Sequence, residues 1–189
     1  MSTLPQVVDK KEKRELDEED MQLLNYEMLS NEFDYEQVKE SESFAIKHYK
    51  DSLYRGETNN RKREGFGVIV YHKGRVYEGE WLDDKRHGHG YEIFANGNTY
   101  HGYYENGKPH GKGIYHWANG EAYEGQFGNG VKDGYGVWKG LKESYIGEWR
   151  ANKAEGYGVH MWENGDRYEG EWKANLRHGN GADFFANGD

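Results

Sequence analysis

The sequence predicts an all-β fold, an elongated single-layer twisted antiparallel meander of tandem β-hairpins, preceded by a short helical N-terminal arm. Three observations predict it. A tyrosine followed two positions later by glycine returns at intervals of 22 or 23 residues, and a Gly-x-Gly pair follows it in every copy. Within each copy, glycine and aromatic residues alternate with charged residues at a period of two, which indicates strands. Self-similarity at this spacing is typical of repeat architectures.

The copies extend over residues 54–189. Four residues after the second glycine of the pair stands an aromatic residue in five of the six copies; the exception is Gly140, in the copy that is one residue short. The repeats begin at Tyr54, Tyr77, Tyr100, Tyr123, Tyr145 and Tyr168.

Each copy contains two expected strands. In Tyr77-Glu-Gly-Glu-Trp81, the first, third and fifth residues share one face. A polar loop, residues 83–87 in this copy, is expected to join the two strands. Asn-Gly pairs such as Asn119-Gly120 then lead into the next copy, and both residues of such a pair accept a positive φ.

The strand glycines have a steric explanation. Glycine inside a strand weakens it, but a residue without a Cβ leaves the sheet flat, so that a neighbouring aromatic ring can cover the backbone. We therefore expect the tyrosines and tryptophans to pack on the glycine pairs.

Residues 1–53 differ from the repeats. Residues 1–43 form an acidic arm, in which Leu24 and Met28 belong to an expected short amphipathic helix over residues 15–33. Residues 44–53 are a candidate degenerate strand that caps the array, since an open sheet edge invites pairing with other chains.

Composition and charge exclude several classes of function. There is no cysteine, which excludes disulfides and thiolate metal sites. The sequence shows neither an apolar stretch of membrane-spanning length nor the apolar core of a secretory signal, so we expect a cytoplasmic protein.

The net charge is −9, of which the first 53 residues carry −7 and the repeats −2. Neither part has the basic stripe of a nucleic-acid binder.

The repeats resemble the MORN (membrane occupation and recognition nexus) family. The likeness rests on segments such as Tyr77-Glu-Gly-Glu-Trp81 and Asn106-Gly-Lys-Pro-His-Gly-Lys-Gly113, and it covers residues 54–189. The resemblance implies an elongated single-layer sheet with a groove that holds partner segments. It also implies a cytoskeletal or axonemal setting, such as a radial spoke of a cilium or flagellum.

No residue pattern indicates catalysis, and we expect no cofactor and no metal. The glycine pairs lie inside strands and lack the helix that a phosphate-binding loop requires. Histidines at equivalent positions, such as His87 and His110, are two strands apart and too distant to share a zinc ion. Paired acids such as Glu78 and Glu80 are expected on a solvated face.

The aromatic face is the candidate binding surface. A single-layer sheet has no second layer to cover it, and exposed aromatic patches mark interaction sites. The candidate groove residues are Tyr77, Trp81, Phe94, Tyr100, Tyr104, Trp117, Tyr123, Phe127, Trp149, Trp162, Tyr168 and Trp172.

We therefore expect a non-catalytic scaffold that binds helical or extended segments of other proteins within a larger assembly. Two alternatives stay open. One is a module apposed to a phospholipid membrane, although direct membrane binding is not favoured by the net charge of the repeats. The other is the regulatory repeat region of a longer enzyme, because the last repeat stops unfinished at Asp189.

Overall fold

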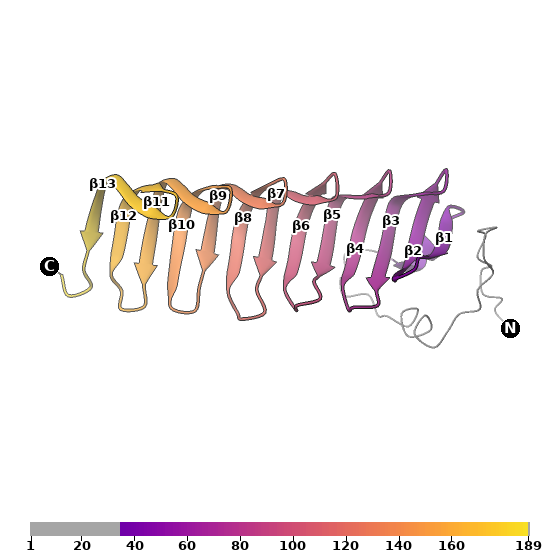
Figure 1. The fold of residues 1–189 in the computed structure, drawn as a ribbon, viewed down its shortest axis with the longest axis horizontal. Coiled ribbons are helices and arrows are strands. Elements are labelled where there is room, and N and C mark those ends of the chain that lie inside the picture. Colours follow the sequence, from indigo (N-terminus) through magenta and orange to yellow (C-terminus); the bar gives the residue numbers. More distant parts are fainter. Residues whose placement is uncertain (1–34, 189) are drawn as a thin grey trace. The chain divides into compact units, whose positions relative to one another are not determined.

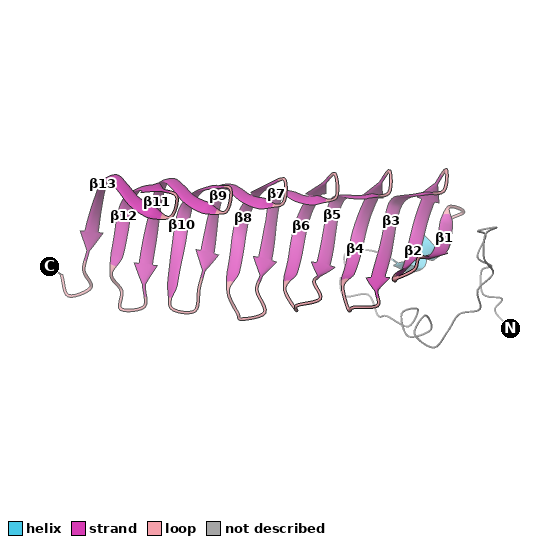
Figure 2. Ribbon diagram, in the orientation of Figure 1, coloured by secondary structure: helices cyan, strands magenta, loops and turns pink. Residues whose placement is uncertain are grey.

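The computed structural model describes residues 35–188, which fall into two compact units, residues up to 95 and residues from 96. Thirteen strands and one short helix make up the described residues (Figure 1, Figure 2). Within each unit the strands form one layer, follow the order of the chain and pair antiparallel with their neighbours. The predicted all-β antiparallel meander is confirmed. Among residues 35–188, no helix is long and apolar enough to cross a membrane.

Unit 1 contains the helix and five strands. Leu53, Val68 and Val76 are buried here, together with the first two repeat tyrosines. Its elements are α2 (Tyr35–Lys39), β1 (Phe44–His48), β2 (Ser52–Asn59), β3 (Lys62–Tyr71), β4 (Val76–Leu82) and β5 (Lys85–Ile93).

Unit 2 contains eight strands, which alternate between a strand with the Tyr-x-Gly motif and one with the Gly-x-Gly pair. Its elements are β6 (Thr99–Glu105), β7 (Lys108–His116), β8 (Ala122–Gly128), β9 (Val131–Lys139), β10 (Glu143–Arg150), β11 (Lys153–Trp162), β12 (Arg167–Lys173) and β13 (Leu176–Phe184).

The turns within each hairpin are shorter than the sequence predicts. The expected loop 83–87 is a two-residue turn, Asp83-Asp84, because β5 already begins at Lys85. Both turn residues have positive φ, 50° and 65°, and Ala151 and Asn152 repeat this with 48° and 69°. Paired positive φ values match the right-handed twist of the flanking strands, which favours such tight turns.

The Asn-Gly turns between copies also differ from the expectation. At Asn119-Gly120 the glycine alone has a positive φ, 96°. The Asn119 side chain instead accepts a hydrogen bond from the backbone N–H of Glu121, at 3.1 Å. The asparagine is therefore used as a side-chain acceptor within the turn.

The first glycine of each Gly-x-Gly pair forms a bulge. Gly134 and Gly156 have φ values of 104° and 69°, and the strand register shifts opposite such glycines. The Glu148 side chain on the neighbouring strand hydrogen-bonds to the backbone at the bulge: its carboxylate oxygen accepts the N–H of Tyr157 at 3.3 Å. The bulge explains why glycine is required there, since other residues avoid this region of φ.

Residues 44–53 contain β1, which pairs antiparallel with β2 from Phe44 to His48. The helix expected over residues 15–33 lies outside the described residues. The short helix α2 was not expected from the sequence.

Candidate protein-interaction face

One side of each unit carries the repeat tyrosines, and we call this side the tyrosine face. Each tyrosine ring covers the second glycine of the Gly-x-Gly pair in its own hairpin and the glycine two positions after the tyrosine: a Cβ on Gly136 would stand 2.5 Å from Cζ of Tyr123. The hydroxyl donates a hydrogen bond to the carbonyl of the residue three positions later, at 3.0 Å from Tyr123 to Gln126. The predicted packing of aromatic rings on strand glycines is therefore present.

A second aromatic residue, four positions after the tyrosine in five of the six copies, links neighbouring copies. Trp149 meets Tyr145 of its own copy edge-on at 5.1 Å between ring centroids and Tyr123 of the preceding copy at 5.4 Å. Its indole Nε1 donates to the carbonyl of Gly136, at 3.2 Å. We call this buried row of alternating rings the aromatic ladder. It holds successive hairpins together, and edge-to-face pairs are the favoured aromatic geometry.

Burial of the ladder changes the titration of its tyrosines. Desolvation raises the pKa of Tyr145 to about 12 and raises the pKa of Tyr54, Tyr77, Tyr100 and Tyr123 further, because a phenolate loses its hydration in the interior. These hydroxyls are therefore structural donors, and proton transfer near neutral pH is not available to them.

An outer set of aromatic residues lies on the same face of unit 2. Strand pairing places Trp138 opposite Tyr123 and Tyr115 opposite Tyr100, so their side chains share the tyrosine face. Together with Trp117 and Trp162 they are half-buried, in contrast to the fully packed ladder. Further along, Phe185 is 51% exposed.

Cationic side chains of the chain itself lie on these rings. Nζ of Lys132 is 3.7 Å from the centroid of the Trp149 ring and also lies over Trp117 and Tyr123. Desolvation lowers the pKa of Lys132 to about 8, with Glu121 acting in the opposite direction. Arg177 lies over Tyr168 at 4.4 Å. Cations over aromatic rings are thus a recurrent feature of the tyrosine face.

In unit 1 ion pairs cover the equivalent positions. Glu92, which is 1% exposed and pairs with Tyr77 across the sheet, accepts hydrogen bonds from Arg75 and Arg86. The Arg86–Glu92 distance is 2.6 Å. The position opposite the repeat tyrosine is therefore filled by a buried ion pair at Glu92 in unit 1 and by half-buried aromatics at Tyr115 and Trp138 in unit 2.

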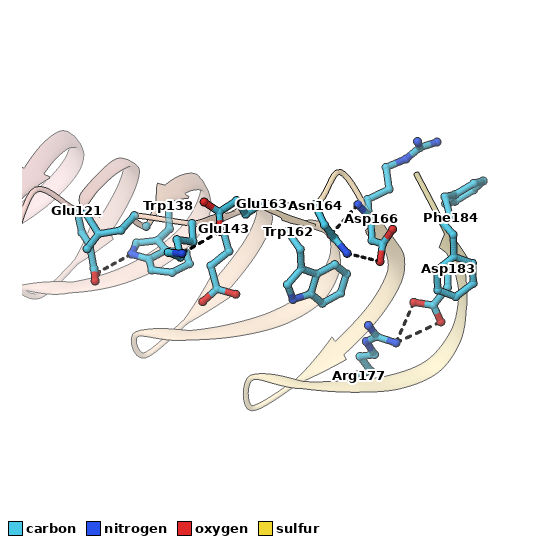
Figure 3. A pocket seen from close by; sticks show the side chains of 15 residues that line it. Glu121, Trp138, Glu143, Trp162, Glu163, Asn164, Asp166, Arg177, Asp183 and Phe184 are labelled. Carbon is cyan, nitrogen blue, oxygen red and sulfur yellow. Dashed lines mark hydrogen bonds and ion pairs between the residues drawn. The ribbon is translucent and has the colours of Figure 1, made fainter. Parts of the chain in front are cut away.

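Unit 2 has a hollow of about 680 Å³ on this side (Figure 3). It opens at Gly140, the position where other copies carry an aromatic residue, and the indole of Trp138 lies against that glycine. Trp138 and Trp162 line the hollow, and Leu141, which is 71% exposed, lies at its side. The shortened copy therefore interrupts the outer aromatic row and leaves a concave site.

The structure divides the candidate groove residues in two. The larger group is at most 8% exposed and belongs to the aromatic ladder, so little of its surface is available to a partner. Phe94, Trp117 and Trp162 are half-buried. The buried group consists of Tyr77, Trp81, Tyr100, Tyr104, Tyr123, Phe127, Trp149, Tyr168 and Trp172.

Sequence reasoning missed Trp138. It stands two positions after Gly136, and a period of two places it on the tyrosine face. That period could have identified Trp138, but the repeating aromatic stands four positions after the glycine, where this short copy has Gly140.

The expectation for the paired acids was wrong. Glu78 is fully buried, and an oxygen of Glu80 accepts the backbone N–H of His89 at 2.7 Å. The bulge needs an acceptor for this N–H, which explains the recurring acid. Among residues 35–188 there is no group of three or more His, Asp or Glu side chains placed to hold a metal ion.

The geometry defines a tandem β-hairpin repeat protein with an aromatic ladder. The MORN repeat model matches residues 77–99, 100–122, 123–140, 145–167 and 168–189, more than half of the chain. The chain belongs to the MORN repeat family, a generally non-enzymatic repeat module, and no catalytic family is indicated. The hairpin that begins at Tyr54 lies outside the matched residues, although Tyr54 donates to the carbonyl of Glu57 as later tyrosines do.

No curated protein matches the chain. Among solved structures, a similar one is the TCP domain of Drosophila melanogaster SAS-4 (dCPAP), in complex with a proline-rich motif of Ana2 (dSTIL). The two chains are 15% identical, with a TM-score of 0.46, over 78% of this chain and 81% of that one.

Proposed function

We propose that the chain is a non-catalytic scaffold that binds segments of partner proteins on the tyrosine face of unit 2. The observation that carries this proposal is the outer aromatic set. Trp117, Trp138 and Trp162 remain half-buried above a ladder that already satisfies its own packing and hydrogen bonds. Large aromatic side chains beside a concave site are the usual anchors of protein interfaces.

Affinity capture of the tagged full chain from its native source, at moderate salt, tests the proposal. The variant Trp138→Ala/Trp162→Ala removes the two walls of the hollow. The matched control is Tyr135→Ala/Tyr157→Ala, since both tyrosines are 56% exposed and pair across the sheet with residues of the opposite face. We expect specific protein partners to be lost with the tryptophan variant and retained with the tyrosine variant, both melting cooperatively.

Equal capture by both variants would contradict the proposal. Purified partner, titrated against both variants, then separates a direct contact from an indirect one. We expect the tryptophan variant to bind at least about tenfold more weakly, because each truncated hot-spot residue costs about 2 kcal/mol or more.

A cytoplasmic location and a place in a larger cytoskeletal or axonemal assembly are part of the proposal. Its support is the family resemblance, and imaging of the native protein in ciliated cells tests it. The second candidate, a membrane-apposed module, has less support because the repeats carry a net charge of −2.

A further inference from the structure

The hollow at Gly140 carries a surplus of negative charge. Three cations line it: Lys142 and Arg177 pair with the lining acids Glu163 and Asp183, at 3.0 and 2.9 Å, and Arg167 pairs with Glu169, at 2.6 Å. Within residues 35–188, no comparable ion pair engages the lining acids Glu121, Asp166 and Glu143. Their partners there are an indole N–H, amide groups and one histidine.

Two of these carboxylates stand beside the tryptophan walls. Glu121 accepts the indole N–H of Trp138 at 3.3 Å, and Oε2 of Glu143 lies 2.8 Å from Nε2 of His160. The His160 ring in turn stacks on Trp162 at 4.5 Å. Figure 3 shows Glu143 between the two indoles in that view. An ionised carboxylate has about four acceptor sites, so these contacts leave acceptor capacity for a ligand.

Neighbouring copies show that the tyrosine face accommodates cations over its aromatic rings. Across the sheet from the second ladder residue, one copy places Lys132 opposite Phe127 and another places Arg177 opposite Trp172. Both cations lie over aromatic rings. In the intervening copy the equivalent residue is Ala154, opposite Trp149. This copy has no cation of its own at that position, which lies outside the residues that line the hollow. At the hollow itself, Arg177 lies over Trp162 at 5.1 Å from the ring centroid and His160 stacks on the same ring, so Trp138 is the outer indole that a ligand can contact.

We propose that the hollow at Gly140 binds an arginine side chain from a basic partner segment, with the guanidinium against Trp138 and paired with Glu121 or Glu143. This inference rests on the proposed function and names the chemistry of its partner. Arginine fits better than lysine because its planar, weakly hydrated guanidinium stacks on aromatic rings and binds carboxylates through two donors. Apolar neighbours of the arginine would contact Leu141 and Phe185.

The probe is the capped peptide Gly-Ser-Leu-Arg-Leu-Ser-Gly, titrated into the full chain. Its matched control replaces arginine by citrulline, which keeps the shape and removes the charge. The readout is the NMR signal of each indole N–H, assigned by single Trp→Phe variants. We expect the arginine peptide to shift the Trp138 and Trp162 signals and the citrulline peptide to bind at least about tenfold more weakly.

The charge of the site is tested with Glu121→Gln/Glu143→Gln, which keeps the size of both side chains. We expect about a tenfold loss for the arginine peptide and no change for the citrulline peptide. Glu124→Gln, an exposed acid that pairs with Val137 and Ile114 on the opposite face, is the control and leaves affinity unchanged. Melting temperatures verify that each variant is folded.

Equal affinity for the two peptides, or no shift of Trp138 and Trp162 at millimolar arginine peptide, would overturn the inference. The two proposals fail separately. A captured partner that is lost in Trp138→Ala/Trp162→Ala but retained at full affinity in the glutamine variant refutes the arginine site and leaves the scaffold function standing. A partner retained in both variants refutes the scaffold function on this face.

Discussion

Glycine and tyrosine form one structural unit at the residue scale. The ring of Tyr123 lies on Gly136, and its hydroxyl donates to the carbonyl of Gln126. The ring therefore covers backbone that a single-layer sheet would otherwise leave to solvent, and the hydroxyl satisfies a carbonyl beside the bulge. Without the ring the glycine backbone would be exposed, and a side chain in place of the glycine would overlap the ring. The two residues therefore recur together.

Gly136→Ala is expected to destabilise the chain strongly. The new methyl group would overlap the Tyr123 ring, which is fully buried and has no room to move away. Overpacking of this kind costs about 2–3 kcal/mol. Chemical denaturation measures it, with Gly107→Asn as control: Gly107 has open space around it and a φ of 82° that asparagine accepts. A control loss as large as the alanine loss would refute the steric explanation.

Alkaline unfolding is expected to be steep. At least five ladder tyrosines have a pKa raised above the ordinary 10.0 by burial. Above pH 10 the unfolded chain loses these protons while the folded chain keeps them. The folded state then binds more protons, so stability falls as pH rises, by about 1.4 kcal/mol per pH unit for each tyrosine.

The measurement is the ultraviolet absorbance of tyrosinate together with circular dichroism. We expect the ladder tyrosines to ionise in the same cooperative step as the loss of strand signal. A smooth ionisation near pH 10 with intact strands would contradict the burial of the ladder.

At the element scale, each hairpin is completed by its neighbour. Trp172 donates to the carbonyl of Gly158 in the copy before it and meets the Tyr145 ring of that copy at 5.3 Å. A single hairpin would leave these groups unsatisfied. Cooperation between adjacent copies is typical of repeat proteins, in which stability resides in nearest-neighbour interfaces.

Lys132→Met is expected to leave the fold at least as stable near pH 7. Methionine retains the apolar stem over Trp149 and removes an ammonium group whose desolvation on folding is unfavourable. The advantage should shrink with rising pH. Between the folded pKa of about 8 and the ordinary 10.5, the unfolded wild type binds the proton and the folded one does not, so wild-type stability rises relative to the variant.

Denaturation series at pH 7 and about pH 9.5 measure the difference. Lys112→Met, which removes a lysine charge at an exposed position that pairs with Gln126, is the control. A difference between Lys132→Met and wild type that is constant with pH would contradict the desolvation of Lys132.

The strands, the repeat period and the packing of rings on glycines were predictable because they depend on local spacing. The division between ladder and outer aromatics was not. Trp149 and Trp162 look alike in sequence, but Trp149 is buried because it reaches Gly136 and Tyr123 in the preceding copy. Trp138 was missed because the expected outer aromatic stands four positions after the second glycine of the pair, whereas Trp138, like Tyr115, stands two positions after it.

At the scale of the whole molecule, charge argues against direct lipid binding. The chain carries a net charge of −9, and anionic membranes attract clusters of lysine and arginine. We expect the full chain to stay in solution with vesicles that contain phosphatidylserine, at physiological salt. Co-sedimentation that weakens with added salt would favour the membrane-apposed alternative.

The tyrosine face serves two purposes in this account. Its inner ladder stabilises the repeats, and its half-buried outer aromatics in unit 2 form the proposed binding surface for a partner. The six tryptophans report on both, because Trp81, Trp149 and Trp172 are buried and donate to glycine carbonyls, whereas the others are half-buried.

The measurement that tests the central claim most directly is the NMR spectrum of the six indole N–H groups with and without a purified captured partner. We predict that the partner shifts the signals of Trp117, Trp138 and Trp162 and leaves those of the three ladder tryptophans in place. A partner that binds tightly without shifting any of the outer three would contradict the claim that this face is the binding surface.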